Sequence, residues 1–124
     1  MADELVYNGS AGIFNDTIDQ GATWQLEVQY LDDNDVPVNL TGYTAAMQLR
    51  TDYLVDPASL TLTSANGSIV ITAGTGTLMI TATATQTYGL SAGIYVYDLE
   101  LTIGTTKTRL IQGMLTVTGE VTNV

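Results

Sequence analysis

Two carboxylates interrupt an otherwise apolar stretch, the segment AGIYVYDLEL at residues 92–101. Because one residue separates Asp98 from Glu100, the two side chains would point to the same face of a strand, about 7 Å apart. A carboxylate pair at this spacing is compatible with glycosidase chemistry. That chemistry also needs a concave site and one raised pKa, and an exposed strand face offers neither. We therefore interpret the two acids as the solvated face of a strand.

The residues that follow supply a cation for the same face. Gly104 and Thr105 predict a turn, and a two-residue loop would place Arg109 opposite Glu100. A loop one residue longer would shift this register, but a cation stays near the acids with either loop. A cross-strand ion pair of this kind contributes about 0.2–1 kcal/mol.

Two further motifs resemble ligand sites, but their spacing argues against both. In DDNDVP, residues 32–37, an EF-hand alignment puts Val36 or Pro37 at the fifth position of the calcium loop. A hairpin tip explains this segment better, with weak cation binding of another kind as the alternative. In GTGTLM, residues 74–79, Met79 stands where a dinucleotide fingerprint needs its third glycine. We interpret that segment as a turn.

The composition excludes most enzyme classes. The 124 residues include no cysteine and no histidine, which removes the thiol nucleophile, the commonest general base and the usual zinc ligands. Thirteen acidic and three basic residues give a net charge of −10, which repels nucleic acid and anionic lipid. We expect no catalysis, no cofactor or metal, and neither a nucleic-acid nor a membrane partner.

The N-terminal sequence MADELVYNGS lacks the basic start and apolar centre of a secretory signal. No stretch reaches the roughly 18 apolar residues that a membrane span needs. We therefore expect a protein made in the cytoplasm of its host. Because the sequence begins with Met1, we also expect a complete small gene product.

Alternating apolar and polar residues predict strands along most of the chain. The clearest runs, residues 24–30 and 43–50, are interpreted as antiparallel neighbours joined by a turn. Asn66-Gly67, between two short apolar segments, predicts a two-residue type I′ hairpin. Further strands are predicted at residues 75–83, 92–101 and 108–119. About seven short strands, with no helix longer than a turn, indicate an all-β, antiparallel, immunoglobulin-like sandwich, and a small barrel is the alternative.

The first 20 residues lack this alternation. We divide the chain into an N-terminal arm, residues 1–20, and a β-sandwich domain, residues 21–124. Because the apolar side chains of the arm have no place in the sandwich pattern, we expect the arm to leave the sandwich and to become ordered against a partner. The residues expected to bind that partner are Leu5, Val6, Tyr7, Ile13 and Phe14.

Most aromatic residues fall on the strand faces assigned to the core. These are Trp24, Tyr43, Tyr95 and Tyr97. Tyr95 follows the corner YGLSAGI, and its hydroxyl is expected to bond back to that corner. Tyr53 and Tyr88 lie in loops instead, where a carbohydrate-binding module would place its aromatic residues.

Three segments together resemble a known group of domains. They are TIDQGATWQLEVQY (17–30), VPVNLTGYTAAMQLR (36–50) and GIYVYDLELTIGTTKTRLIQGMLTV (93–117). The group comprises small immunoglobulin-like or fibronectin-like sandwich domains of tailed-bacteriophage virions, similar to the N-terminal domain of baseplate upper proteins. The motifs that carry the resemblance are Gln20-Gly21-Ala22-Thr23, Leu40-Thr41-Gly42-Tyr43 and Tyr97-Asp98-Leu99-Glu100.

The resemblance implies a structural protein of a virion, without catalysis. It suggests an adaptor that attaches fibres or receptor-binding proteins to a tail or baseplate, in contact with other virion proteins and with copies of itself. A capsid decoration protein is one alternative. A carbohydrate-binding adhesion module, with a host surface glycan as its partner, is the other. The expected location is the virion.

Overall fold

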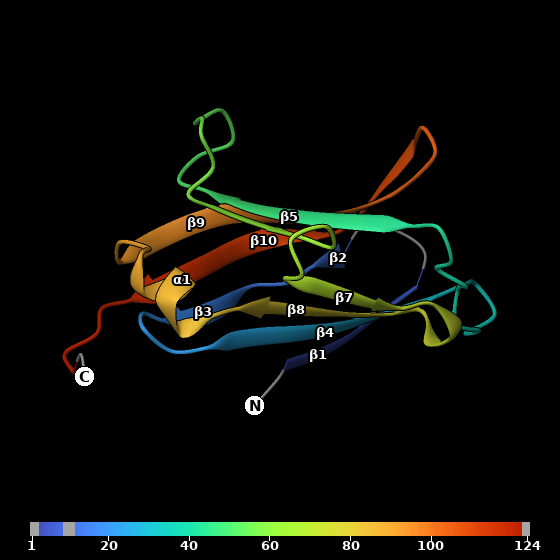
Figure 1. Ribbon diagram of the computed structural model, residues 1–124, viewed down its shortest axis with the longest axis horizontal. Helices are drawn as coiled ribbons and strands as arrows, with labels where there is room; N and C mark the ends of the chain where they lie inside the picture. Colours follow the sequence, from blue (N-terminus) through green and yellow to red (C-terminus); the bar gives the residue numbers. More distant parts are fainter. Residues whose placement is uncertain (1–2, 9–11, 123–124) are drawn as a thin grey trace.

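Two β-sheets packed face to face form the protein (Figure 1). The computed structural model describes residues 3–8 and 12–122. One sheet has four strands in the order β1-β4-β8-β7, and the other has six, in the order β2-β10-β9-β5-β6 with β3 also paired to β10. The all-β sandwich predicted from the sequence is confirmed.

The seven strands expected from the sequence are β4 to β10, and the N-terminal segment supplies three more. The strands are β1 Asp3–Asn8, β2 Gly12–Ile13, β3 Asp16–Asp19, β4 Trp24–Leu31, β5 Thr44–Arg50, β6 Leu60–Thr63, β7 Ile69–Thr72, β8 Thr77–Ala82, β9 Gly93–Ile103 and β10 Thr106–Thr118. A 3-10 turn, η1 Ala73–Thr75, and a five-residue helix, α1 Ala84–Tyr88, complete the described elements. Neither of these two helical segments is long and apolar enough to cross a membrane.

The core lies between the sheets and takes alternate side chains of β4, β5 and β9. In β9 the buried residues are Tyr95, Tyr97, Leu99 and Leu101. Asp98 and Glu100 alternate with them and face outward, as predicted. Trp24 is buried at the start of β4. Fully burying a large apolar side chain contributes about 1.5–3 kcal/mol, so this alternation fixes which face of each strand points inward.

One predicted pairing is wrong, because β4 and β5 belong to different sheets. The chain between them crosses from one sheet to the other, and a single bridge between Leu31 and Pro37 marks where it turns away. Both strands bury one face. Alternation alone therefore looks the same whether two strands lie side by side or face each other across a core.

The predicted Asn66-Gly67 hairpin is also wrong, since β6 and β7 lie in opposite sheets. A type I′ turn needs positive φ at both central residues, but of this pair only Gly67 has one, at 84°. The Asn66 side chain organises the crossing instead. Its Oδ1 accepts hydrogen bonds from the backbone N–H groups of Thr63, at 3.1 Å, and Ser68, at 3.0 Å.

The N-terminal segment is part of the sandwich, so the expectation that it leaves is wrong. β1 pairs in parallel with β4, from Asp3 opposite Leu26 to Asn8 opposite Leu31. β2 and β3 pair in parallel with β10. The predicted boundary between arm and sandwich domain, at residue 20, therefore lies between β3 and β4 of one sandwich. The pieces at residues 12–13 and 16–19 are too short to show a period, and backbone pairing at a sheet edge makes little demand on side-chain pattern.

The junction of β2 and β3 packs directly on the backbone of β10. A Cβ at Gly113 would collide with the carbonyl oxygen of Phe14 and lie 2.7 Å from Oδ1 of Asn15. Two hydrogen bonds fix this approach. The Phe14 N–H donates to the Gln112 carbonyl at 3.0 Å, and the Met114 N–H donates to Asn15 Oδ1 at 2.8 Å. Only glycine leaves space for so close a contact.

Replacing Gly113 with alanine should therefore lower the free energy of unfolding by about 1–3 kcal/mol, the usual cost of overpacking. Gly119→Ala is the matched control, because a Cβ at Gly119 would have no neighbour within 4 Å. This control should change stability by less than about 0.5 kcal/mol. Urea denaturation measures both variants. Equal stability of the two would contradict the packing of the N-terminal segment on β10.

Candidate functional site

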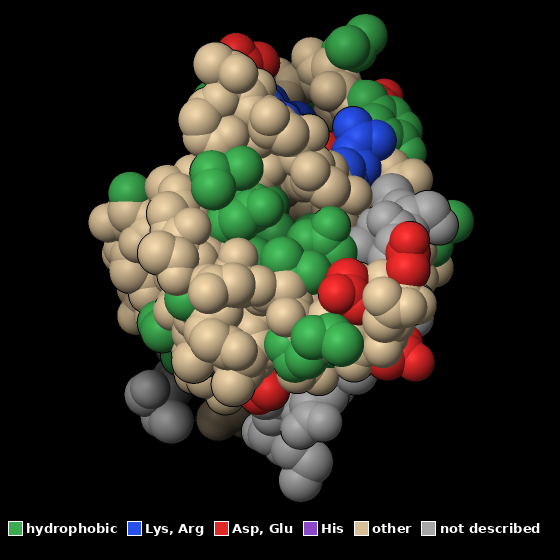
Figure 2. Space-filling model, turned by 90° about the vertical axis from the view of Figure 1, so that its right-hand side faces the viewer, with side chains coloured by type: hydrophobic (Ala, Val, Ile, Leu, Met, Phe, Trp, Pro, Cys, Tyr) green, Lys and Arg blue, Asp and Glu red, His purple; other side chains and the backbone are tan. Residues whose placement is uncertain are grey.

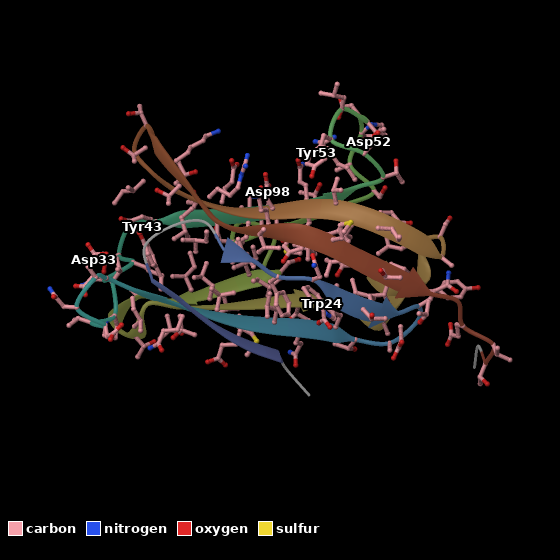
Figure 3. All side chains as sticks on the ribbon, turned by 180° about the vertical axis from the view of Figure 1, so that it is seen from behind. Trp24, Asp33, Tyr43, Asp52, Tyr53 and Asp98 are labelled. Carbon is pink, nitrogen blue, oxygen red and sulfur yellow. The ribbon has the colours of Figure 1, made fainter. Side chains whose placement is uncertain are left out.

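The outer face of the six-stranded sheet carries a depression with a volume of about 510 Å³. Loop 51–59 and the tip of the β9–β10 hairpin both rise above this face (Figure 1). Asp98 and Tyr53 lie on the same side of the molecule (Figure 3). The volume falls within the roughly 300–1,000 Å³ of small-molecule sites.

The depression combines charged, polar and apolar side chains from β2, β5, β9, β10 and loop 51–59. Its charged residues are Arg50, Asp98, Glu100 and Arg109. The formal charges of these four residues sum to zero, although the net charge of the whole chain is −10. The apolar part comes from Ile13, Val96, Met114 and the ring of Tyr53. The site is therefore neutral overall and amphipathic.

Arg109 makes the predicted cross-strand ion pair, but with Asp98. Its backbone is paired opposite Glu100, as a two-residue loop requires. The register then shifts between Arg109 and Ile111, and Arg109 Nε lies 3.3 Å from Asp98 Oδ2. The guanidinium also donates to Gln112 Oε1 at 3.1 Å. Because both charged side chains are partly exposed, the pair contributes at most about 1 kcal/mol; its main effect is to fix the two side chains in place.

Arg50 ties loop 51–59 to the sheet. Its Nη1 donates to the Val55 carbonyl at 2.6 Å and lies 3.2 Å from Asp56 Oδ1. Its Nη2 donates to Gln48 Oε1 at 2.8 Å, within β5. These bonds hold the loop beside the depression, where Tyr53 remains 78% exposed.

The five residues predicted to bind a partner lie in two places. Ile13 is 75% exposed and lines the depression, whereas Phe14 is half buried and packs against the core. Leu5, Val6 and Tyr7 lie in β1, whose backbone pairs with β4; their side chains fall outside the described part of the structure. Partner binding by these residues stays a prediction.

Two buried tyrosines bond to the backbone through their hydroxyls. Tyr95 donates to the Ser91 carbonyl at 2.6 Å, which confirms the predicted corner. Tyr97 donates to the Phe14 carbonyl at 2.6 Å and so ties β9 to the N-terminal segment. Sequence reasoning placed Tyr97 in the core but gave no sign of this bond. Burial raises the pKa of the Tyr97 phenol, and the nearby charge of Asp16 raises it further.

The other sequence motifs contribute no site of this kind. In the acidic loop, Asp32 Oδ1 accepts hydrogen bonds from the backbone N–H groups of Asn34, at 2.8 Å, and Val36, at 3.0 Å, so it organises a turn. Among the residues at 3–8 and 12–122, no cluster of three acidic side chains is placed to hold a metal ion. Tyr88 ends α1, where it is 51% exposed, and it does not line the depression.

Comparisons with known proteins show similarity in fold. No protein-family model matches the sequence, and no curated protein matches it. Among solved structures, the N-terminal domain of phage TP901-1 ORF48 aligns with a TM-score of 0.54 at 12% identity, over 94% of this chain and 98% of that one. A cysteine protease inhibitor, EhICP2 of Entamoeba histolytica, aligns with a TM-score of 0.48 at 11% identity, over 93% and 97%.

The raised pKa of Tyr97 predicts a specific pH dependence of stability. In the unfolded chain the phenol ionises around its ordinary pKa of 10.0, whereas in the folded protein it stays neutral to higher pH. Its contribution to stability is therefore complete below pH 10 and is lost as the pH rises through the folded pKa. The free energy of unfolding should fall more steeply with pH, from about 9 to 11, in the native protein than in Tyr97→Phe.

Urea denaturation across this pH range measures the two slopes. Tyr53→Phe, which removes an exposed phenol hydroxyl, serves as the control for the loss of a tyrosine hydroxyl. At neutral pH, Tyr97→Phe should also lose about 0.5–1.5 kcal/mol with its hydrogen bond to Phe14. The account of Tyr97 fails if the native protein and Tyr97→Phe show parallel pH profiles.

Proposed function

We propose that this chain is a non-enzymatic structural protein of a phage virion, acting as a tail, baseplate or fibre-attachment adaptor that binds neighbouring virion proteins. The observation that carries the proposal is the likeness in fold to a phage domain over nearly the full length of both chains. The segments that resemble virion sandwich domains support it, because they form β3–β4, β5 and β9–β10 of this fold.

The chemistry of the depression favours binding over catalysis. Asp98 is held by Arg109, and the sequence contains no histidine or cysteine to serve as a base or nucleophile beside it. Arg109 is bonded to Asp98 and Gln112, and Arg50 is bonded to Gln48, on an open sheet face. Such an arrangement can recognise a surface or a ligand, but it lacks an activated group.

Free sheet edges supply surfaces for neighbouring proteins. β7 ends the four-stranded sheet and β6 ends the six-stranded one, while β1 forms the edge opposite β7. Edge strands present backbone groups to which a strand of another chain can pair. Val70 of β7 is also 59% exposed. The edge position of β1 is compatible with a partner-binding role for Leu5, Val6 and Tyr7.

One end of the sandwich offers a second contact surface. Figure 2 shows apolar side chains gathered there with acidic side chains beside them. This is the end at which loop 32–43 and the β9–β10 turn lie (Figure 1), and Val36 and Ile103 are exposed apolar residues of these segments. An apolar centre with charged side chains near its edge suits a protein partner that places complementary charges around its contact.

Purified particles of the phage that encodes the chain provide the test. Mass spectrometry should find the chain in the particles, and electron cryomicroscopy should place its sandwich at the tail or baseplate. Density on the capsid shell would instead identify a decoration protein. Absence from particles would contradict any virion role.

Deleting residues 2–8 tests the proposed role of β1. Because β1 is an edge strand, we expect the sandwich to remain folded, with β4 as the new edge and a thermal midpoint only a few degrees lower. Incorporation into particles should be lost. A matched variant with Leu5, Val6 and Tyr7 replaced by threonine keeps the strand but removes its apolar side chains. Normal incorporation of both variants would show that β1 does not bind the partner.

A further inference from the structure

We propose that the depression on the outer face of the six-stranded sheet binds a neutral saccharide. In this site Tyr53 stacks against a sugar ring, while Asp98 and Gln112 form hydrogen bonds with the hydroxyl groups of the sugar. The inference concerns a ligand of this face and does not depend on which virion protein the chain contacts.

The charge of the lining selects a neutral ligand. Arg50 and Arg109 are two of the three basic residues in the chain, and both lie in the depression together with Asp98 and Glu100. The ion pair with Arg109 already satisfies Asp98, so a cationic ligand gains little attraction from that carboxylate. An anionic ligand finds Arg109 paired with Asp98 and Arg50 paired with Asp56, and the net negative charge of the chain repels it. A neutral polar molecule avoids both penalties.

The polar groups are preorganised for hydroxyl groups. Arg109 holds Asp98 at 3.3 Å and the Gln112 amide oxygen at 3.1 Å, so neither side chain has to be ordered when a ligand binds. The second carboxylate oxygen of Asp98 can accept a hydrogen bond, and the Gln112 amide nitrogen can donate one. A sugar hydroxyl both donates and accepts, and neighbouring hydroxyls on a ring match a site that presents both functions side by side.

The apolar groups match the other side of a sugar. The C–H groups on one face of a pyranose ring form a flat apolar surface, which packs well on an aromatic ring. Tyr53 offers such a ring, and the bonds of Arg50 to Val55 and Asp56 hold its loop beside the depression. Ile13 and Met114 are also exposed and widen the apolar surface.

A protein partner fits this lining less well. The centres of protein interfaces are depleted in charged residues, whereas four charged side chains occupy this depression. The face also lies on the opposite side of the sandwich from β1 (Figure 1). A saccharide could therefore bind while β1 and its sheet contact a neighbouring protein.

An array of neutral hexose and N-acetylhexosamine oligosaccharides, with sialylated and sulfated oligosaccharides as charged comparisons, tests the proposal with the purified full chain. We expect binding to be confined to neutral members. Calorimetric titration with the bound oligosaccharides should then show an affinity loss of at least tenfold for Tyr53→Ala, and a comparable loss for Asp98→Asn.

Tyr88→Ala is the matched control, because it removes an exposed tyrosine that lies outside the depression; its affinity should equal that of the native protein. Thermal melting of all variants establishes that they are folded, which is expected because Tyr53 and Asp98 contribute nothing to the core. Absence of binding to every neutral oligosaccharide, or binding of the anionic ones alone, would overturn the proposal. So would an equal loss in Tyr53→Ala and Tyr88→Ala, or binding of a virion protein in place of saccharides.

Discussion

The pairing of β10 along both of its edges is the interaction on which the rest of the structure depends. On one edge β10 runs antiparallel to β9 from Thr106 to Val117, and on the other it pairs with β2 and β3. Gly113 allows the N-terminal segment to approach the strand closely. The Tyr97 hydroxyl then reaches the Phe14 carbonyl from β9. The N-terminal segment is thus held by the two longest strands of the protein.

The same pairing builds the candidate site. Because β2 lies beside β10, Ile13 reaches the rim of the depression from one side. The register shift in β10 after Arg109 brings the guanidinium to Asp98 and Gln112. Bulges of this kind redirect side chains and are common near functional sites. The candidate site and the fold therefore share one structural origin, which is the irregular pairing of β10.

Much of this fold could be predicted from the sequence, because a strand with one buried face has apolar residues at every second position. The buried tyrosines and leucines of β9 and the two-residue turn before β10 follow from that period. The alternation does not indicate which sheet a strand joins, and the predicted pairing of β4 with β5 is therefore wrong. Alternation can be recognised only in a strand of several residues, so the short strands β2 and β3 cannot be predicted from it.

The candidate site was predictable only in parts. Asp98, Glu100 and Arg109 could be placed on one face from the strand pattern, and Tyr53 could be recognised as a loop aromatic. Nothing in the sequence brings Tyr53, or Ile13 of the N-terminal segment, to this face. Their proximity depends on the bonds between Arg50 and loop 51–59 and on the docking of the N-terminal segment, and both are tertiary contacts between residues of unremarkable type.

Hydrogen exchange of the backbone amides at residues 12–20 in the isolated protein tests the central claim most directly. The Phe14 N–H donates to Gln112 and the Gln20 N–H donates to Thr118, each at 3.0 Å. If the N-terminal segment is an integral part of the six-stranded sheet, these amides should be protected to a degree comparable with those of β9. Exchange as fast as that of the exposed turn at Gly104 and Thr105 would contradict the account and restore the segment to the role of a free arm.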